Sequence, residues 1–389
     1  MDEEDKKSLT LRSGSELAVS KPKGSRIVSQ MTQDVLARTH SREAPQARFK
    51  LGDYEFREPD YRQILRWSEQ LEMHPEALLE VLQNSVNYAE KKKDRFTVED
   101  GAITTLVWSL RRLAHYPPST WEPGLVIKEL YILGIPGHWP DTEPSLRPVL
   151  PCLRVLELPG EFEGGQSYGP LRTLDLSLVP GLTGLNCKGN QLTELDLSPV
   201  PGLTDLNCSE NQLTELDLSP VPGLTDLNCS ENQLTELDLS PVPGLTRLFL
   251  GGNRLTELDL SPVPELSELS CQRNQFTELD LSLVPGLSIL YCNINKLTEL
   301  DLSPVPGLTK LHCHVNQLTE LDLSPVPGLT RLYCHKNQLT ELDLSPVPDL
   351  NTLYCDNTVH IDNAPSELMR AKASKSWARF FRLNPARGS

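Results

Sequence analysis

The chain has 389 residues and a formal net charge of −16 at pH 7, with 53 acidic residues against 37 lysines and arginines. A nucleic-acid-binding domain would show a basic stripe instead, and no run of about 18 apolar residues is available to span a membrane. The N-terminal residues MDEEDKKSLTLRSGSE lack the apolar core of a signal peptide. We therefore expect a cytoplasmic, monomeric protein that binds neither nucleic acid nor membrane.

Residues 1–50 are polar, contain few aromatic side chains, and are typical of a disordered arm. From Asp60 onward the apolar residues recur at helical spacing, which predicts a first helix. Pro75 suits the first turn of a second helix, because its missing N–H is tolerated there, and that helix is expected to end near the lysines at 91–93. The apolar face of the first helix is formed by Ile64, Leu65, Trp67 and Leu71.

The dipeptide Asp100-Gly101 lies between alternating apolar residues, which predicts a β-hairpin. After it, apolar residues occur three times at a degenerate L-x-x-L-x-L spacing, separated by inserts rich in proline and glycine. The three sets are Ile103/Leu106/Trp108, Ile127/Leu130/Ile132 and Leu153/Leu156/Leu158.

A 21-residue unit then repeats almost unchanged. The copy that starts at Leu203 reads LTDLNCSENQLTELDLSPVPG, and the next copy starts at Leu224 in the same register. A fixed period of this length indicates a solenoid, in which each repeat packs only on its neighbours. We expect the regular solenoid to span residues 161–358. Because the end of a solenoid exposes apolar surface, residues 51–160 are expected to form a helical and hairpin N-terminal cap with degenerate repeats.

Each copy has two apolar halves, L-T-x-L-x-C and L-T-E-L-D-L. Each half is expected to form a short extended pass with its Leu and Cys pointing inward, and stacked passes would form parallel β-ladders. The asparagine after the first pass, from Asn190 to Asn337, is expected to satisfy backbone groups of the neighbouring turn. The S-P-V-P-G segment turns the chain back. Because 21 residues leave no room for a helix, the convex side should be thin and extended.

Eight of the nine cysteines occupy one place of the repeat, and Leu250 takes that place in the remaining copy. A position that accepts either Cys or Leu is an apolar core position, so we expect buried, reduced thiols. No C-x-x-C pair is present to suggest a zinc or thioredoxin-type site, and disulfides would need an oxidising compartment.

The frame L-x-x-L-x-[C/L]-x-x-N resembles the leucine-rich repeat. With its 21-residue period and cysteines, it is similar to the short bacterial class found in the cysteine-bearing internalins. The resemblance covers roughly Leu171 to Leu353. It implies a solenoid with a concave face of parallel strands, a thin extended convex face, and a protein-binding role.

Variation between the copies concentrates at the outward positions of the first half, which form the concave face in leucine-rich repeats. These positions are small, polar and acidic in the early copies, and aromatic and basic in the later ones. Exposed aromatic residues beside arginine are typical of binding hot spots, although aromatic neighbours on adjacent strands also stabilise a sheet without any ligand. The candidate partner-binding residues are Arg247, Phe249, Tyr291, Lys310, His312, Arg331, Tyr333 and Tyr354.

The sequence contains no P-loop, G-x-S-x-G or H-E-x-x-H string. We therefore expect a non-catalytic scaffold for a protein partner, with no cofactor and no catalytic or metal site. A metal hypothesis rests on His312, His314 and His335. Two functional alternatives stay open. One is an activity in residues 50–160, with the repeats selecting the substrate. The other is a membrane-surface adaptor that uses residues 359–389, whose basic amphipathic pattern also suits a C-terminal cap.

Overall fold

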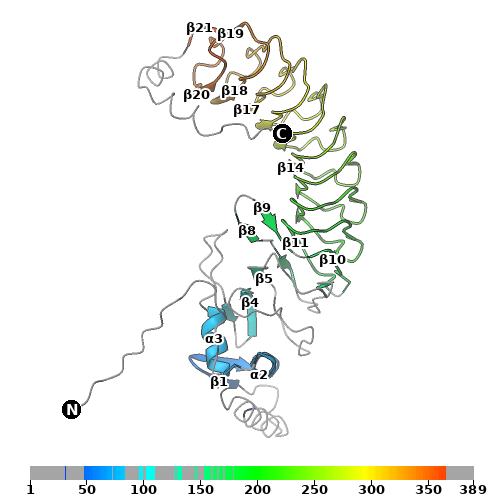
Figure 1. Ribbon diagram of the computed structural model, residues 1–389, viewed down its shortest axis with the longest axis vertical. Helices are drawn as coiled ribbons and strands as arrows, with labels where there is room; N and C mark the ends of the chain where they lie inside the picture. Colours follow the sequence, from blue (N-terminus) through cyan, green and yellow to red (C-terminus); the bar gives the residue numbers. More distant parts are fainter. Residues whose placement is uncertain are drawn as a thin grey trace, which may run out of the picture.

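The protein forms a curved stack of short turns, and its strands line the inner side of the curve (Figure 1). This architecture confirms the predicted repeat solenoid. The computed structural model describes residues 31, 48–71, 73–83, 96–99, 102–109, 127, 129–133, 145–146, 153–158, 161–163, 166–169, 171–177 and 179–364.

The inner side is a 13-stranded sheet in the order β20-β18-β17-β16-β15-β14-β13-β12-β11-β7-β5-β4-β3. Adjacent strands of this sheet are parallel, except β3 and β4, which are antiparallel. Each repeat residue pairs with its equivalent in the next copy, as Leu206 does with Leu227. The strands are β3 (Phe96–Glu99), β4 (Ala102–Ser109), β5 (Glu129–Leu133), β7 (Val155–Glu157), β11 (Gly184–Asn186), β12 (Asp205–Asn207), β13 (Asp226–Asn228), β14 (Arg247–Phe249), β15 (Glu268–Ser270), β16 (Ile289–Tyr291), β17 (Lys310–His312), β18 (Arg331–Tyr333) and β20 (Thr352–Tyr354).

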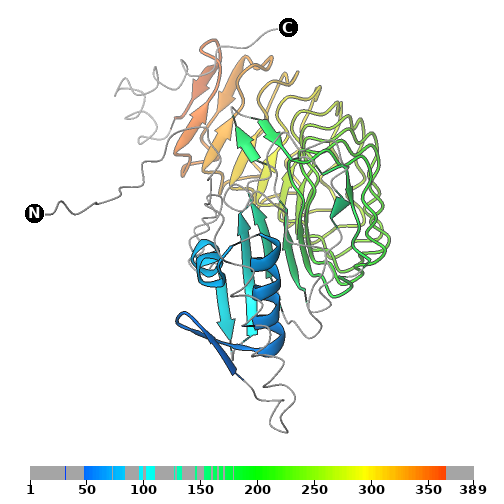
Figure 2. The ribbon, with the colours of Figure 1, turned by 60° about the horizontal axis from the view of Figure 1, so that its bottom comes forward.

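The N-terminal part packs two helices and a hairpin against the end of this sheet, where Figure 2 shows them close to β4. A second antiparallel pair, β3 with β4, agrees with the hairpin predicted around Asp100-Gly101. The lysines at 91–93 lie outside the described residues, so the predicted end of the second helix stays a prediction. The same holds for the boundaries of the four predicted segments. The elements are β1 (Arg48–Leu51), β2 (Tyr54–Arg57), α2 (Glu58–Gln70) and α3 (Pro75–Gln83).

A buried carboxylate joins α2 to the sheet. Asp60 is fully buried, and its Oδ1 accepts the backbone N–H of Ile103 on β4 at 2.8 Å. Its Oδ2 accepts the Arg57 Nη2 at 2.9 Å. Burial raises the pKa of Asp60, while these two partners oppose the rise. The contact positions the N-terminal helices on the first strands of the stack.

The core of each turn is a fixed set of apolar side chains. In the copy that starts at Leu203, six of them are at most 2% exposed: Leu203, Leu206, Cys208, Leu213, Leu218 and Val221. Burial of one such leucine contributes about 1.5–3 kcal/mol. The eight described cysteines are buried, as predicted, and burial raises the pKa of Cys208 well above its usual value.

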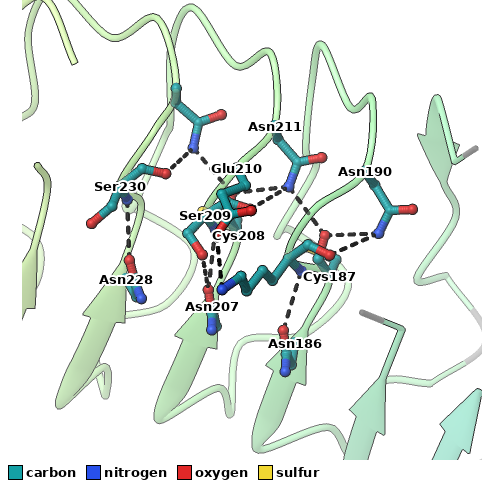
Figure 3. A network of polar contacts seen from close by, with 12 residues as sticks. Asn186, Cys187, Asn190, Asn207, Cys208, Ser209, Glu210, Asn211, Asn228 and Ser230 are labelled. Carbon is teal, nitrogen blue, oxygen red and sulfur yellow. Dashed lines mark hydrogen bonds and ion pairs between the residues drawn. The ribbon is translucent and has the colours of Figure 1, made fainter. Parts of the chain in front are cut away.

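The asparagine of each turn connects neighbouring copies, as the sequence predicted (Figure 3). The Nδ2 of Asn211 donates to the carbonyl oxygens of Cys187 at 3.1 Å and of Cys208 at 3.0 Å. Its Oδ1 accepts the backbone N–H of Leu192 at 3.0 Å. One side chain thereby satisfies backbone groups in two consecutive turns.

The second half of the repeat differs from its predicted form. It was expected to build a second β-ladder, but of its regular copies only the last one, β19 (Glu341–Asp343), forms a strand, which pairs with β21 (His360–Asp362). At the other end, β10 (Thr173–Leu174) pairs with β6 (Ser145–Leu146). Figure 1 places β10, β19 and β21 on the outer side of the curve. Because the stack curves toward the sheet, the outer passes fan apart, which opposes regular hydrogen bonding between them.

Two short strands complete the described structure: β8 (Glu161–Glu163) pairs antiparallel with β9 (Gln166–Tyr168).

Within the ranges that the structure describes, no helix has both the length and the apolar character needed to cross a bilayer.

Candidate functional site

Four of the predicted binding residues form one continuous column of rings on the concave face. In each strand the middle leucine is buried and the residues on either side point outward. The parallel register then places Tyr291 beside His312, His312 beside Tyr333, and Tyr333 beside Tyr354. The ring centroids are 4.6, 4.1 and 4.3 Å apart in that order. All four side chains are partly buried and present their remaining surface to solvent.

A short basic column lies beside these rings. Lys310 and Arg331 pair in the sheet register two residues upstream of His312 and Tyr333. Burial, together with the cations of Arg331 and Lys310, lowers the pKa of His312 to about 4. His312 is therefore neutral at physiological pH, so the positive charge of this surface comes from the lysine and the arginine.

The structure does not bring Phe249 and Arg247 into the column. Both lie on β14, and β15 separates them from Tyr291 by about 10 Å, two strand spacings. On β15 the position between them holds Ser270, which is 5% exposed. Arg247 instead forms an ion pair with Asp226 on the preceding strand. The predicted residues therefore divide into a column on β16, β17, β18 and β20 and an isolated pair on β14.

Two residues that the sequence analysis missed border the column. Ile294 and Val315 have left-handed backbone φ values of 58° and 57°. β-Branched residues are genuine outliers in this region, where strain costs about 1–3 kcal/mol. Ile294 is also one of two large apolar side chains that are exposed among the described residues, at 36%. The same place in other copies holds Gly189, Glu210, Glu231, Gly252, Arg273 and Lys336.

The metal hypothesis receives no support from the geometry. His314 and His335 stack with their ring centroids 4.5 Å apart and an interplanar angle of 11°. Stacked rings direct their nitrogen lone pairs side by side, within the ring planes, and not toward a shared ion. Over the described ranges, no three His, Cys, Asp or Glu side chains are grouped to hold a metal. The rings of His314 and His335 instead widen the aromatic surface next to His312 and Tyr333.

The comparisons with known proteins concern the fold. No protein-family model and no curated protein matches the chain. Among solved structures, the leucine-rich repeat protein LIC12759 of Leptospira interrogans superposes with a TM-score of 0.51 and 25% identity, over 64% of this chain and 63% of that one. The chain is a leucine-rich repeat solenoid.

Two further structures are similar to this leucine-rich repeat chain. The functional domain of InlJ from Listeria monocytogenes, which includes a cysteine ladder, is 38% identical over 54% of this chain and 50% of that one, with a TM-score of 0.46. YopM from Yersinia enterocolitica WA-314 is 27% identical over 64% and 60%, with a TM-score of 0.48. The chain spans less than two thirds of each of the three structures.

Proposed function

We propose that this leucine-rich repeat chain is a non-catalytic scaffold that binds a protein partner through the later half of its concave face. The binding surface consists of the ring column on β16, β17, β18 and β20, the basic pair Lys310 and Arg331, and the bordering residues Ile294 and Val315. Solenoids provide extended concave surfaces of this kind for binding.

The observation that carries this proposal is the change in surface chemistry along an otherwise uniform stack. The equivalent positions on β11, β12 and β13 hold Asn186, Asn207 and Asn228. The sheet does not require rings at this position, because β11, β12 and β13 pair in the same parallel register with asparagine there. Strained β-branched residues at the same edge support a surface role, since backbone strain is concentrated at functional sites.

The test is affinity capture with three forms of the full chain: the unaltered protein, the triple variant Tyr291→Ala/Tyr333→Ala/Tyr354→Ala, and the control variant Asn207→Ala. A genuine partner is retained by the unaltered and control chains and lost by the triple variant. With the purified partner, each tyrosine change is expected to weaken binding by about 1–3 kcal/mol, about 5-fold to 150-fold in Kd.

A partner that binds the triple variant as tightly as the unaltered chain would refute the proposal. Thermal unfolding of all three forms serves as the folding control, because the rings also contact one another.

A further inference from the structure

A long groove runs along the outer side of the stack, opposite the sheet. Its volume is about 2510 Å³, and the Glu-Leu-Asp segments of eight consecutive copies line it, from Glu194-Leu195-Asp196 to Glu341-Leu342-Asp343. Thr173 and Asn363 lie at its two ends. Its lining contains no lysine, arginine or histidine. The groove therefore has two acidic residues per turn and no cation from its own lining to balance them.

The leucines of these segments give the groove an apolar floor. Leu195, Leu216, Leu237, Leu258 and Leu279 are only partly buried, although they pack on the core. Solvent-accessible leucine at the same place of successive turns forms an apolar strip between two rows of carboxylates. This surface differs from a simple cluster of acids, because it offers burial as well as charge.

The two rows of acids have different local roles. Asp217 accepts the backbone N–H of Ser219 at 2.9 Å, and this contact recurs in each of the eight copies. Bonds from the hydroxyl and N–H of Ser219 hold the pKa of Asp217 below its usual value, so it stays ionised. The glutamates, such as Glu215, are exposed. The aspartates therefore shape the turn, while the glutamates are available to a ligand.

The part of the chain that follows the groove has the complementary charge. Asp362 and Asn363 line the end of the groove, and residues 365–389 continue from there. This segment has one acidic residue, Glu367, and a side-chain charge of +5. Its six basic residues are Arg370, Lys372, Lys375, Arg379, Arg382 and Arg387, and its large apolar residues are Leu368, Met369, Trp377, Phe380, Phe381 and Leu383.

The spacing of the basic residues also fits the groove. Lys372, Lys375, Arg379 and Arg382 are separated by three, four and three residues, a spacing that would place them on one face if the segment were helical. At a rise of about 1.5 Å per residue they would be about 5 Å apart on average. Adjacent strands of the inner sheet are about 4.8 Å apart, and the outer passes are somewhat further apart because they fan out. A helix laid along the groove would therefore present about one cation to each turn.

We propose that residues 365–389 bind in cis in the outer groove, with their basic residues on the glutamate row and their apolar residues against the leucine strip. The reach is sufficient: eight turns span at least about 34 Å, whereas 25 extended residues reach about 80 Å. The covalent link makes the contact intramolecular, and a short link corresponds to an effective concentration in the millimolar range. The ring column and the basic pair on the concave face stay free for a partner.

A labelled form of the full chain tests this contact. Ser376→Cys in a Cys152→Ser background carries a spin label, and the eight cysteines of the stack are buried and react slowly. The groove variant changes all eight groove glutamates to Gln and leaves the aspartate turns intact. The control variant, Glu265→Gln/Glu268→Gln/Asp349→Asn, removes acids that do not line the groove.

At low salt we expect an immobile label in the unaltered and control chains, and loss of this immobile component in the groove variant. About 1 M salt should also release the label, because the Debye length shortens to about 3 Å. A carbodiimide should cross-link Lys372 or Lys375 to a groove glutamate in the unaltered and control chains, but not in the groove variant.

Three outcomes would overturn the proposal. The label could be mobile in the unaltered chain at low salt. It could be immobile but insensitive to the groove glutamates, which would indicate a cap on the last turn. Or it could become immobile only after anionic vesicles are added, which would indicate a membrane contact. Thermal unfolding of each variant verifies that the stack is intact.

Discussion

Replacing Asn232 with alanine should destabilise the chain by an amount that follows from its hydrogen bonds. Asn232 is 7% exposed. Its Nδ2 donates to the carbonyl oxygens of Cys208 and Cys229, both at 3.0 Å, and its Oδ1 accepts the N–H of Leu213 at 3.0 Å. Alanine removes these three bonds and a longer one from Nδ2 to the carbonyl oxygen of Ser230 at 3.3 Å, and it leaves the rest of the turn in place.

The three losses are unequal. The carbonyl oxygen of Cys208 also accepts from Asn211 at 3.0 Å, and that of Cys229 also accepts from Asn253 at 3.1 Å. Each carbonyl therefore keeps a donor and loses about 0.5–1.5 kcal/mol. The N–H of Leu213 loses the acceptor that Asn232 provides, and an unsatisfied buried donor costs about 1–3 kcal/mol. The sum predicts a destabilisation of about 2–6 kcal/mol.

Urea unfolding of the full chain measures this change, with Gln212→Ala as the control. Gln212 lies in the equivalent turn one copy earlier, and its side chain is exposed, so its removal should change the free energy by less than about 0.5 kcal/mol. Two spectroscopic probes are needed, because a repeat array can unfold in parts.

A change for Asn232→Ala no larger than for Gln212→Ala would refute the bridging role of the asparagine. Asn232→Asp provides a second check. It keeps an acceptor for Leu213 but places a carboxylate oxygen against two carbonyl oxygens, so it should be at least as destabilising as alanine.

Two further predictions concern the core and the pH response. Cys208→Ser places a hydroxyl in a buried apolar row and should destabilise the chain by about 1–3 kcal/mol. Cys208→Leu should be tolerated better, since Leu250 fills the equivalent place in another copy. Urea unfolding compares the two variants, and an equal loss of stability would contradict the prediction that this is an apolar core position. The pKa values of His312 and His314 are lowered to about 4, against about 6.5 in the unfolded chain. The unfolded state therefore binds more protons between these values, so stability should be constant above pH 6.5 and fall toward pH 4. Between pH 7 and pH 5 we expect a loss of about 2 kcal/mol for the two rings, with their partial exposure allowed for, and a His312→Gln/His314→Gln variant should lose this slope.

The inside of the stack could be predicted from the sequence because the repeat specifies it many times. Identical spacing of Leu203, Leu206 and Cys208 in each copy determines which side chains point inward, and the burial of these residues confirms that prediction. The role of the asparagine followed in the same way, because a buried turn must satisfy its backbone groups. A one-dimensional pattern is sufficient where each turn contacts only its neighbours.

The outer surface was harder to predict, for three physical reasons. Curvature is a property of the whole stack, so the single repeat did not show that the outer passes fan apart. Because both residues are aromatic, the sequence analysis placed Phe249 and Tyr291 in one candidate site. Contact between their rings would require adjacent strands, and β15 lies between the two strands that carry them. The left-handed backbone at Ile294 was also missed. Its signal was present in the sequence, because the same place holds Gly189 and Gly252, which favour positive φ.

Ile294 joins these points in one prediction, in which stability and binding change in opposite directions. At a φ of 58° a β-branched residue is strained, whereas glycine adopts this conformation freely. Ile294→Gly should therefore stabilise the chain by up to about 1 kcal/mol, after the loss of the partly buried side chain is subtracted. Arg273→Gly is the matched control, since Arg273 has a φ of 54° but is not β-branched, and it should stabilise the chain less.

Partner binding should respond in the other direction. If Ile294 borders the binding surface, Ile294→Gly should weaken capture of the concave-face partner, whereas Arg273→Gly, one turn before Ile294, should affect it less. Urea midpoints and partner affinities measured on the same four preparations, including the unaltered chain and the Tyr333→Ala variant, decide the matter. Weaker binding with a raised midpoint would mean that this strain is retained for recognition. Unchanged binding with a raised midpoint would mean that Ile294 is not part of the binding surface. A lowered midpoint would refute the argument that the backbone at Ile294 is strained.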